Sequence, residues 1–418
     1  MSSLTSAIGA TLGTMDRRRR VLAVTCGVHA LHDGFTDLIY VLLPIWQAEF
    51  ALSYAALGVL RMLFTGVMAS FQLPLSHLAR RVGGPLLLAI GTALAGGAYL
   101  TIGLSGAGFV MLAAALMVGG VGAAVQHPIG SALVSAAYAA HGSRSALGTY
   151  NFAGDLGKMA LPAATAWLLV VMPWRPALGL IGMLGIGGAA AILLLLPPKL
   201  DVAPEPDMAA RTVPTAHTQP RQRLGFPLLL AIGIVDSATR MGFLAFLPFV
   251  LRAKGAATPT IGIALTLIFT GGAVGKLACG LLGARLGVLR AVLLTELATA
   301  LGIVALGWLP LDASLACLPI IGIALNGTSS VLYGTVPELV PPDRREHAFG
   351  LFYTGTIGGG AIAPALYGFA GDAFGPERAI FIVAAVCMLT LPLAWALRPS
   401  LTDPRQRNQP SAAATRTG

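Results

Sequence analysis

Residues 27–46 read GVHALHDGFTDLIYVLLPIW, a stretch apolar enough to cross a membrane although two histidines and two aspartates lie in its first half. About 20 mainly apolar residues are needed to span a bilayer. Similar stretches recur along the 418 residues, of which 56% are hydrophobic and only 11% charged. Because a typical soluble domain carries about 25% charged residues, this composition indicates an all-α integral membrane protein.

Twelve such spans can be placed on the chain, in two groups of six. The segment between the groups, residues 197–225, is rich in proline and charge and cannot bury apolar area, so we interpret it as a linker. The expected spans are 22–46, 54–79, 85–105, 108–133, 146–172, 176–196, 226–251, 259–283, 288–308, 313–336, 347–370 and 379–397. The expected organisation is a cytoplasmic N-terminal segment (1–21), an N-terminal six-helix bundle (22–196), the cytoplasmic linker (197–225), a C-terminal six-helix bundle (226–397) and a cytoplasmic tail (398–418).

The positions of Lys and Arg orient the chain. With the N-terminus inside, nineteen of the 27 lie in cytoplasmic segments, four in outer loops and four within spans. This bias predicts a multi-pass protein of the cell membrane with both termini in the cytoplasm. It also accounts for the net charge of +10 without a nucleic-acid partner, because the charges lie in short loops and not along one domain face. The RRRR at 17–20 precedes a run too long and too polar for a cleaved signal peptide, so we expect a retained helix.

An internal repeat relates the two halves of the chain. SHLARRVGG at 76–84 corresponds to GLLGARLGV at 280–288, and Pro44 corresponds to Pro248, and both pairs are 204 residues apart. GDLGKMALP at 154–162 likewise matches GTIGGGAIAP at 355–364. A repeat in this register predicts that the two six-helix bundles are pseudo-symmetric.

Twelve spans with a basic, glycine-containing turn after spans two and eight resemble the major facilitator superfamily over about residues 20–400. In that family the turn usually reads G-x-L-A-D-R-x-G-R. The matching residues that we expect to act in gating are Arg81, Gly83, Arg285 and Gly287. Arg80 and Ala284 stand where the family has aspartate, so any gating that relies on those two charges lacks its residues here.

Within the superfamily, the first two spans resemble the fosmidomycin-resistance group of drug exporters. The shared features are His29 and Asp33, the run Pro44, Gln47, Glu49, Phe50, Leu52 and Ser53, and the pair His127 and Pro128. Pro162 in span five and Pro364 in span eleven partly match the antiporter motif, and a proline kink suits a gating hinge. The resemblance implies export of a small molecule in exchange for protons by alternating access.

Ionisable residues within spans are costly and are therefore functional candidates by default. His29, Asp33, Asp37 and Tyr40 fall at i, i+4, i+8 and i+11, on one stripe of span one. Asp33 lies about 16 Å along a helix of roughly 37 Å, near the bilayer midplane. We expect this stripe to face a cavity, with Asp33, Asp37, His29 and Asp236 of span seven in proton coupling. The alternative is a set of fixed ion pairs that serve packing.

Further polar residues within the spans are candidates for substrate binding. Four basic residues there suit an anionic substrate such as a phosphonate, phosphate ester or carboxylate, or equally serve as counter-ions to acids. Asp155 and Lys158 at i, i+3 can also neutralise each other. Glu296 in span nine is expected to be a less central acid in helix packing. The substrate-binding candidates are His32, Tyr40, Arg61, His127, Asn151, Asp155, Lys158, Arg240, Lys276 and Asn326.

The chain contains no nucleotide-binding, zinc-protease or C-x-x-C motif, and its four cysteines lack metal-site spacing. We therefore expect a transporter and not an enzyme, with no cofactor and no metal. The expected partners are a small-molecule substrate, protons and the lipid bilayer, and the expected state is a monomer. Two alternatives stay open: proton-coupled uptake of an organic anion by symport, and a non-transporting membrane sensor or scaffold, which the missing gate aspartates favour.

Overall fold

The computed structural model describes residues 16–106, 108–139, 142–197, 224–341 and 344–401. All regular structure in these ranges is helical. The first half contains α2 (Arg17–Phe50), α3 (Tyr54–Val82), α4 (Gly84–Leu104), α5 (Phe109–Ala123), η1 (Gln126–Gly130), α6 (Ser131–Ala137), α7 (Ser143–Val171) and α8 (Trp174–Leu195). The second half contains α9 (Gly225–Ala253), α10 (Thr258–Leu286), α11 (Val288–Trp308), α12 (Leu311–Leu339), α13 (Arg345–Phe374), α14 (Pro376–Cys387), α15 (Thr390–Leu397) and η5 (Arg398–Ser400). The expected N-terminal segment, linker and tail lie largely outside the described ranges.

Nine helical segments of the described ranges are long and apolar enough to cross a membrane. One of them, Phe109–Ala137, combines α5, η1 and α6, and another, Pro376–Ser400, combines α14, α15 and η5. Helices α2, α7 and α13 have 34, 29 and 30 residues but are less apolar. An all-helical membrane protein is therefore confirmed, with helices close to the expected spans, while the count of twelve spans stays a prediction.

The ends of several helices follow local sequence signals. Asp16 and Ser53 cap α2 and α3, because each side chain accepts a hydrogen bond from a backbone N–H of the first turn. Gly83 ends α3 and begins α4 with a φ of 101°, and Gly287 does the same between α10 and α11 with a φ of 81°. Such angles favour glycine, so both copies of the repeated turn use it in the same backbone role.

Close contacts between neighbouring helices rest on small residues. Gly157 of α7 lies against Ala30 of α2 so closely that any Cβ would collide with the Ala30 carbonyl oxygen. Gly96 of α4 and Gly185 of α8 face each other in the same way. Small residues let helices approach closely in lipid, where no hydrophobic effect drives them together.

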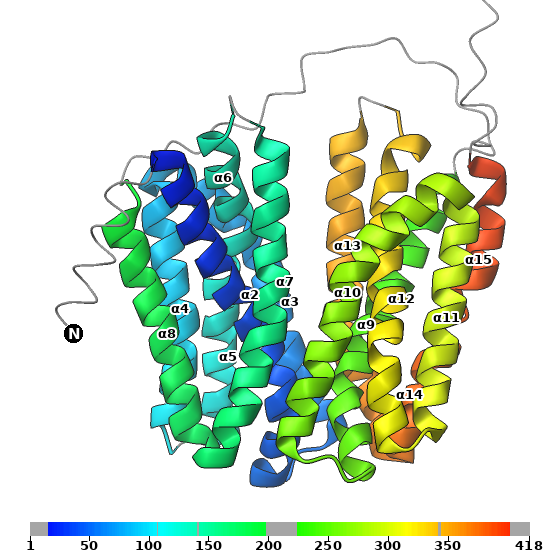
Figure 1. The fold of residues 1–418 in the computed structure, drawn as a ribbon, viewed down its shortest axis with the longest axis horizontal. Coiled ribbons are helices and arrows are strands. Elements are labelled where there is room, and N and C mark those ends of the chain that lie inside the picture. The colour runs from blue at the N-terminus through cyan, green and yellow to red at the C-terminus, as the bar shows by residue number, and fades with distance from the viewer. Residues whose placement is uncertain (1–15, 107, 140–141, 198–223, 342–343, 402–418) are drawn as a thin grey trace, which may run out of the picture.

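Helices α2–α8 and α9–α15 form two groups that lie side by side (Figure 1). The groups meet mainly where α3 packs against α13 and α7 packs against α10. Gly58 of α3 lies on the carbonyl of Pro364, and Gly262 of α10 lies near the carbonyl of Pro162. Because Gly58 and Gly262 are 204 residues apart, these contacts occupy equivalent positions of the repeat. Both prolines expected to act in gating therefore lie on the seam between the groups.

Polar contacts hold the seam together at the end where α2 stops and α3 begins. Asp372 of α13 accepts hydrogen bonds from the backbone N–H groups of Tyr54 (2.6 Å) and Ala55 (3.1 Å) in the first turn of α3. A carboxylate is favourable at this position because the N-terminus of a helix carries partial positive charge. Arg252 of α9 also donates to the carbonyl oxygen of Pro44 at 3.5 Å. This end of the seam is closed.

Candidate functional site: a charged cavity between the two helix groups

A cavity of about 590 Å³ lies between the two groups of helices. Its volume is typical of sites that bind small organic molecules. The lining includes eleven of the residues singled out from the sequence, namely Asp33, Asp37, Arg61, His127, Asn151, Asp155, Lys158, Asp236, Arg240, Lys276 and Asn326. Acids and bases from both groups therefore meet in one space.

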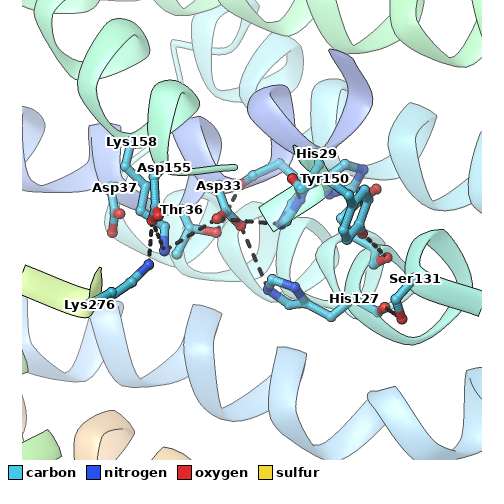
Figure 2. A network of polar contacts seen from close by, with 12 residues as sticks. His29, Asp33, Thr36, Asp37, His127, Ser131, Tyr150, Asp155, Lys158 and Lys276 are labelled. Atoms are coloured by element: carbon cyan, nitrogen blue, oxygen red, sulfur yellow. Dashed lines mark hydrogen bonds and ion pairs between the residues drawn. The ribbon is translucent and has the colours of Figure 1, made fainter. Parts of the chain in front are cut away.

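Asp33 is the centre of a polar network on the α2 side of the cavity (Figure 2). Its carboxylate lies 3.2 Å from Nζ of Lys158, 3.5 Å from Nε2 of His29 and 3.6 Å from Nε2 of His127. The three nitrogens come from α7, α2 and η1, and Asp33 itself is only 6% exposed. A buried carboxylate with several charged or chargeable neighbours is typical of a site that binds and releases protons.

The position of one proton on His29 follows from the partner of its second ring nitrogen. Nδ1 of His29 lies 2.8 Å from the backbone carbonyl oxygen of Tyr150. A carbonyl oxygen only accepts, so Nδ1 carries a proton, and a neutral His29 then presents an unprotonated Nε2. That Nε2 faces the Asp33 carboxylate, which also offers lone pairs. The contact is attractive only when a further proton is bound to His29 or to Asp33.

Tyr150 of α7 holds His29 in this orientation. The two rings stack with 4.1 Å between their centroids. The Tyr150 hydroxyl donates to the backbone oxygen of Gln126 (2.9 Å) and accepts from the Gln126 side-chain amide (3.0 Å). Neither Tyr150 nor Gln126 was predicted from the sequence, because only the fold brings α7 against α2 and η1. The one available signal was the position of Tyr150 directly before Asn151.

His127 enters the cavity from η1, a π-helical turn within the span that α5 begins. Pro128 follows it, and a proline inside a helix lacks an N–H and clashes with the preceding turn, which accounts for the wider turn. The His127 side chain is 38% exposed, and its ring meets that of His29 edge-on with 5.2 Å between centroids. The local distortion therefore aims a histidine at Asp33.

A chain of charges links the two groups of helices (Figure 2). Nζ of Lys276 on α10 lies 2.5 Å from Oδ1 of Asp155 on α7. Nζ of Lys158 lies 3.9 Å from the same oxygen. The expected local pair between Asp155 and Lys158 is therefore longer than the contacts that these two residues make with Lys276 and Asp33. Because α2 and α10 both pack against α7, each member of that pair finds a closer partner on a neighbouring helix.

Asp37 pairs with a different base. Its Oδ1 lies 3.6 Å from Nη2 of Arg61, and the same Nη2 donates to the Tyr40 hydroxyl at 3.2 Å. Nε and Nη1 of Arg61, and Nε of Arg240, are buried and have no hydrogen-bond partner among the described residues. Buried donors without a partner are costly, so they suit an anionic group of a bound ligand.

The second group of helices contributes a carboxyl with different surroundings. Asp236 and Arg240 line the cavity from α9, but within the described part of the chain no basic nitrogen lies within ion-pair distance of Asp236. The Asp236 carboxyl instead neighbours that of Glu296 on α11. Glu296 lies outside the cavity lining, in line with the expectation of a less central acid, and it is packed behind a residue that does line the cavity.

Three predicted residues do not line the cavity. His29 is covered by α7, and Tyr40 is covered by Arg61 and by Met241 of α9, whose Sδ lies 3.4 Å from the hydroxyl. His32 turns toward α4, where its Nε2 lies 3.0 Å from Oγ1 of Thr92. The expectation that the whole stripe of span one faces the cavity is therefore wrong, because the cavity borders only the middle of α2.

The residues expected to act in gating lie outside the cavity lining. Arg81 and Arg285 are exposed beside the turns of Gly83 and Gly287. Together with the two prolines of the seam, these residues are placed to affect the movement of helices and not to contact a ligand. Their role in gating stays a prediction.

The cavity residues that were not predicted from the sequence are all uncharged. They include Ser237, Met241, Leu244, Phe269, Ser329, Ser330, Tyr333, Phe352, Tyr353 and Thr356. Apolar and aromatic residues of a membrane span carry no local signal that separates a cavity face from a core face. Thr65, Met68 and Gln72 follow Arg61 at helical spacing on α3 and line the cavity with it.

His29, Asp33 and His127 also form a group whose candidate ligand atoms all lie within 4.8 Å of one another. Two imidazoles and a carboxylate are ligands for transition metals. The Lys158 ammonium already lies 3.2 Å from the Asp33 carboxylate and would repel a divalent ion. The arrangement suits a proton better, and we assign no metal to it.

Comparisons with known proteins agree with this description. A fosmidomycin resistance protein from Escherichia coli (strain K12) is 24% identical over 388 residues, which are 91% of this chain and 92% of that protein. A bacterial homologue of the human lysosomal transporter Spinster, inward-facing and unoccupied, has a TM-score of 0.76 at 16% identity over 94% of this chain and 100% of its own. The nucleoside transporter NupG has a TM-score of 0.73 at 12% identity over 93% and 100%. The model of the Major Facilitator Superfamily matches residues 25–235 and again 228–417. The chain therefore belongs to the Major Facilitator Superfamily.

Proposed function

We propose that the protein is a proton-coupled secondary transporter that exports a small polar organic compound across the cell membrane in exchange for protons. Membership of the Major Facilitator Superfamily supports transport of a small molecule, and the resistance named for the Escherichia coli relative supports export. The contact between His29 and Asp33 carries the proton coupling, because it is attractive only when a proton is bound there.

Antiport requires that the substrate and the proton exclude each other. The lone pairs of Asp33 can hold a proton or accept hydrogen bonds from N–H or O–H groups of a substrate, but each lone pair serves one of them. An anionic group of the same substrate would take the unpartnered donors of Arg61 or Arg240. Loading a compound with both kinds of group therefore favours release of the proton.

Alternating access needs two bodies that move against each other. We assign them to the six-helix bundles 22–196 and 226–397 with twelve spans in total, joined by a cytoplasmic linker and with both termini in the cytoplasm. The two successive matches of the family model and the equivalent seam contacts of Gly58 and Gly262 support this division. In this orientation, the end that Asp372 closes is the outer one, because span one crosses outward and α3 begins there.

The test of export uses inside-out membrane vesicles with an acidic interior. We expect fosmidomycin, or another compound from a panel of phosphonates, phosphate esters and carboxylates, to accumulate in the vesicles while the pH gradient lasts. A protonophore should stop the accumulation. If every transported compound accumulated equally with and without the pH gradient, proton coupling would be contradicted.

The outer closure can be tested separately. Asp372→Ala removes both acceptors from the start of α3, so we expect a larger outward-open population. The measurement is labelling of Ser237→Cys in the cavity by a membrane-impermeant maleimide, in a background without the four native cysteines. Glu377→Ala, which changes an acid in the first turn of α14, is the control. Equal labelling in Asp372→Ala and the control would count against this outer gate.

Uptake by symport is the second candidate, and the contact between Lys158 and Asp33 favours it. An anion drawn to Lys158 would weaken that 3.2 Å contact and thereby stabilise a proton on Asp33, so proton and substrate would bind together. The pH dependence of binding to the purified protein separates the candidates. Antiport predicts weaker binding as the pH falls, and symport predicts stronger binding.

A non-transporting sensor or scaffold remains the alternative of another class, because Arg80 and Ala284 replace the gate aspartates. The charged cavity argues for transport, since burying ionisable groups is costly without a function for them. Thermal unfolding of the purified protein across the compound panel tests ligand binding. Stabilisation by a compound that no vesicle assay transports would favour the sensor.

A further inference from the structure

Asp236 and Glu296 form a pair of buried carboxyls in the second group of helices. Asp236 is 4% exposed and Glu296 is 2% exposed. The two carboxyls are neighbours across the contact between α9 and α11. A carboxylate only accepts hydrogen bonds, whereas a protonated carboxyl also donates one. Two neighbouring carboxyls in an apolar interior therefore attract each other only when they hold a proton between them.

The repeat places these two positions in contact independently. His32 and Thr92 precede Asp236 and Glu296 by 204 residues each, which is the register of the repeated turn. Nε2 of His32 lies 3.0 Å from Oγ1 of Thr92. The contact between α2 and α4 in the first half thus corresponds to the contact between α9 and α11 in the second. In the first half the pair is a histidine and a threonine, and in the second it consists of two acids.

The surroundings of Glu296 offer hydrogen-bond donors but no counter-charge. Its Oε2 accepts from Sγ of Cys387 on α14 (3.2 Å) and from Oγ1 of Thr390 on α15 (3.3 Å). The nearby Thr328 hydroxyl of α12 donates to Oγ1 of Thr295 at 2.7 Å. Oε1 is buried and accepts no hydrogen bond from a donor among the described residues.

Charged and titratable groups around the pair are few. Arg240 lies one helical turn along α9 from Asp236, and the Cys387 thiol contacts Glu296. Throughout the described ranges, no nitrogen of a Lys, Arg or His side chain lies within ion-pair distance of either carboxyl. Ionising both carboxyls would therefore place two like charges in contact in an apolar interior, which is strongly unfavourable.

We propose that Asp236 and Glu296 bind one exchangeable proton between them, and that this proton reaches the cavity through Asp236. Asp236 lines the cavity, whereas Glu296 lies behind it. The pair is a second proton site, in the other group of helices from the site of His29 and Asp33. A role of this proton in transport rests on the proposed function. The binding and the exchange of the proton do not, because they are properties of the pair alone.

Arg240 is placed to control the release of this proton. Its side chain lines the same cavity, and movement toward Asp236 would stabilise the ionised carboxyl. A bound anion that attracts Arg240 would have the opposite effect and would keep the proton on the pair. The substrate can therefore influence the second site without touching it.

Infrared spectroscopy of the purified full-length protein in lipid nanodiscs tests the pair without any substrate. At pH 7, where ordinary carboxyls with pKa values near 4 are ionised, we expect a carbonyl stretching band from a protonated carboxyl. Glu296→Gln and Asp236→Asn should each remove or shift this band. Thr92→Val, which alters the equivalent pair in the first half, should leave it unchanged. Transfer into D₂O should shift the band within minutes in the native fold.

Three results would overturn the proposal. The first is a wild-type protein with no protonated carboxyl band at pH 7. The second is a band that both acid variants leave unchanged. The third is a band that does not shift in D₂O until the protein unfolds, which would mark a locked structural proton. If neither variant folds, the wild-type band and its isotope shift still decide. Failure of the vesicle assay alone would reject proton-coupled export and leave the pair intact.

Discussion

The two halves of the chain place their buried polar pairs at equivalent positions but with different chemistry. In the first half, His32 and Thr92 form a hydrogen bond between α2 and α4. In the second half, Asp236 and Glu296 occupy the same positions between α9 and α11. The shared helix packing shows that the backbone permits contact at these sites. The side chains then decide whether the contact binds a proton.

On the face of α2 that lines the cavity, the first half has acids where the second half has uncharged residues. Asp33 and Asp37 of α2 correspond to Ser237 and Met241 of α9, which also line the cavity but carry no charge. The acids of the first half thus lie beside bases of the cavity. In the described ranges, the acid pair of the second half has no base within ion-pair distance. We infer that the first site responds directly to a bound substrate, and that the second responds through Arg240.

The largest effect is expected for Asp33→Asn, which removes the carboxylate that His29, His127 and Lys158 share. We expect at least a tenfold loss of gradient-driven transport, or about 1.4 kcal/mol or more. Substrate-driven proton release from inside-out vesicles is the measurement. The matched control is Asp312→Asn, which changes an acid in the first turn of α12, outside the cavity lining. Unchanged proton release in Asp33→Asn would show that the assignment of the coupling site is wrong.

A smaller effect is expected for Glu296→Gln, which keeps the shape of the side chain but cannot release a proton. Transport should continue at a rate within a few-fold of wild type, with one proton fewer exchanged per substrate molecule. Simultaneous measurement of substrate flux and proton flux gives this ratio. Thr92→Val should keep the wild-type ratio. If Glu296→Gln also kept it, the shared proton would have no part in transport.

Lys276→Met should have a modest effect, because it breaks the ion pair of α10 with Asp155 across the two groups of helices. The Lys276 side chain is 41% exposed, so solvent screens the pair and its loss should cost under about 1 kcal/mol. We expect a change of a few-fold in apparent substrate affinity. Lys276→Arg should restore most of it. A loss as large as that of Asp33→Asn would place Lys276 within the coupling site itself.

The smallest effect is expected at Glu49, beyond the expected end of span one. Its Oε1 accepts a hydrogen bond from Arg175 at 2.6 Å, and this bond lowers the pKa of the Glu49 carboxyl. A lowered pKa in the folded state contributes stability above the ordinary value of about 4.3, and this contribution is lost as the pH falls through the lower value. Glu49→Gln should therefore leave transport at neutral pH unchanged. Any difference in thermal stability from wild type should be present at pH 7 and disappear in strong acid.

Local sequence patterns predicted the helices and much of the site for a physical reason. An apolar span of fixed length must be helical in lipid, since every backbone group needs a partner. Ionisable residues within such spans are few, so naming them, as with Asp33, Lys158 and Arg240, also identified most charged residues of the cavity. The helical period also placed Asp33 and Asp37 on one face, and both line the cavity.

The helical period did not predict correctly which residues at the ends of the polar stripe of α2 line the cavity. His29 and Tyr40 share a face with Asp33, but neighbouring helices cover them. Local spacing also suggested that Lys158 pairs with Asp155, whereas Asp33 offers a shorter contact from α2. Distances between helices are tertiary properties, and no spacing within one helix determines them.

The sequence by itself determined that this protein is a bundle of membrane helices with a repeat of 204 residues and a small set of buried charges, because hydropathy and register are local. Tertiary structure decided which charges meet. It fixed one proton on His29 through the carbonyl of Tyr150, and it brought Glu296 against Asp236. Protonation of a buried group depends on the neighbours that packing supplies, and those neighbours lie on helices far apart along the chain.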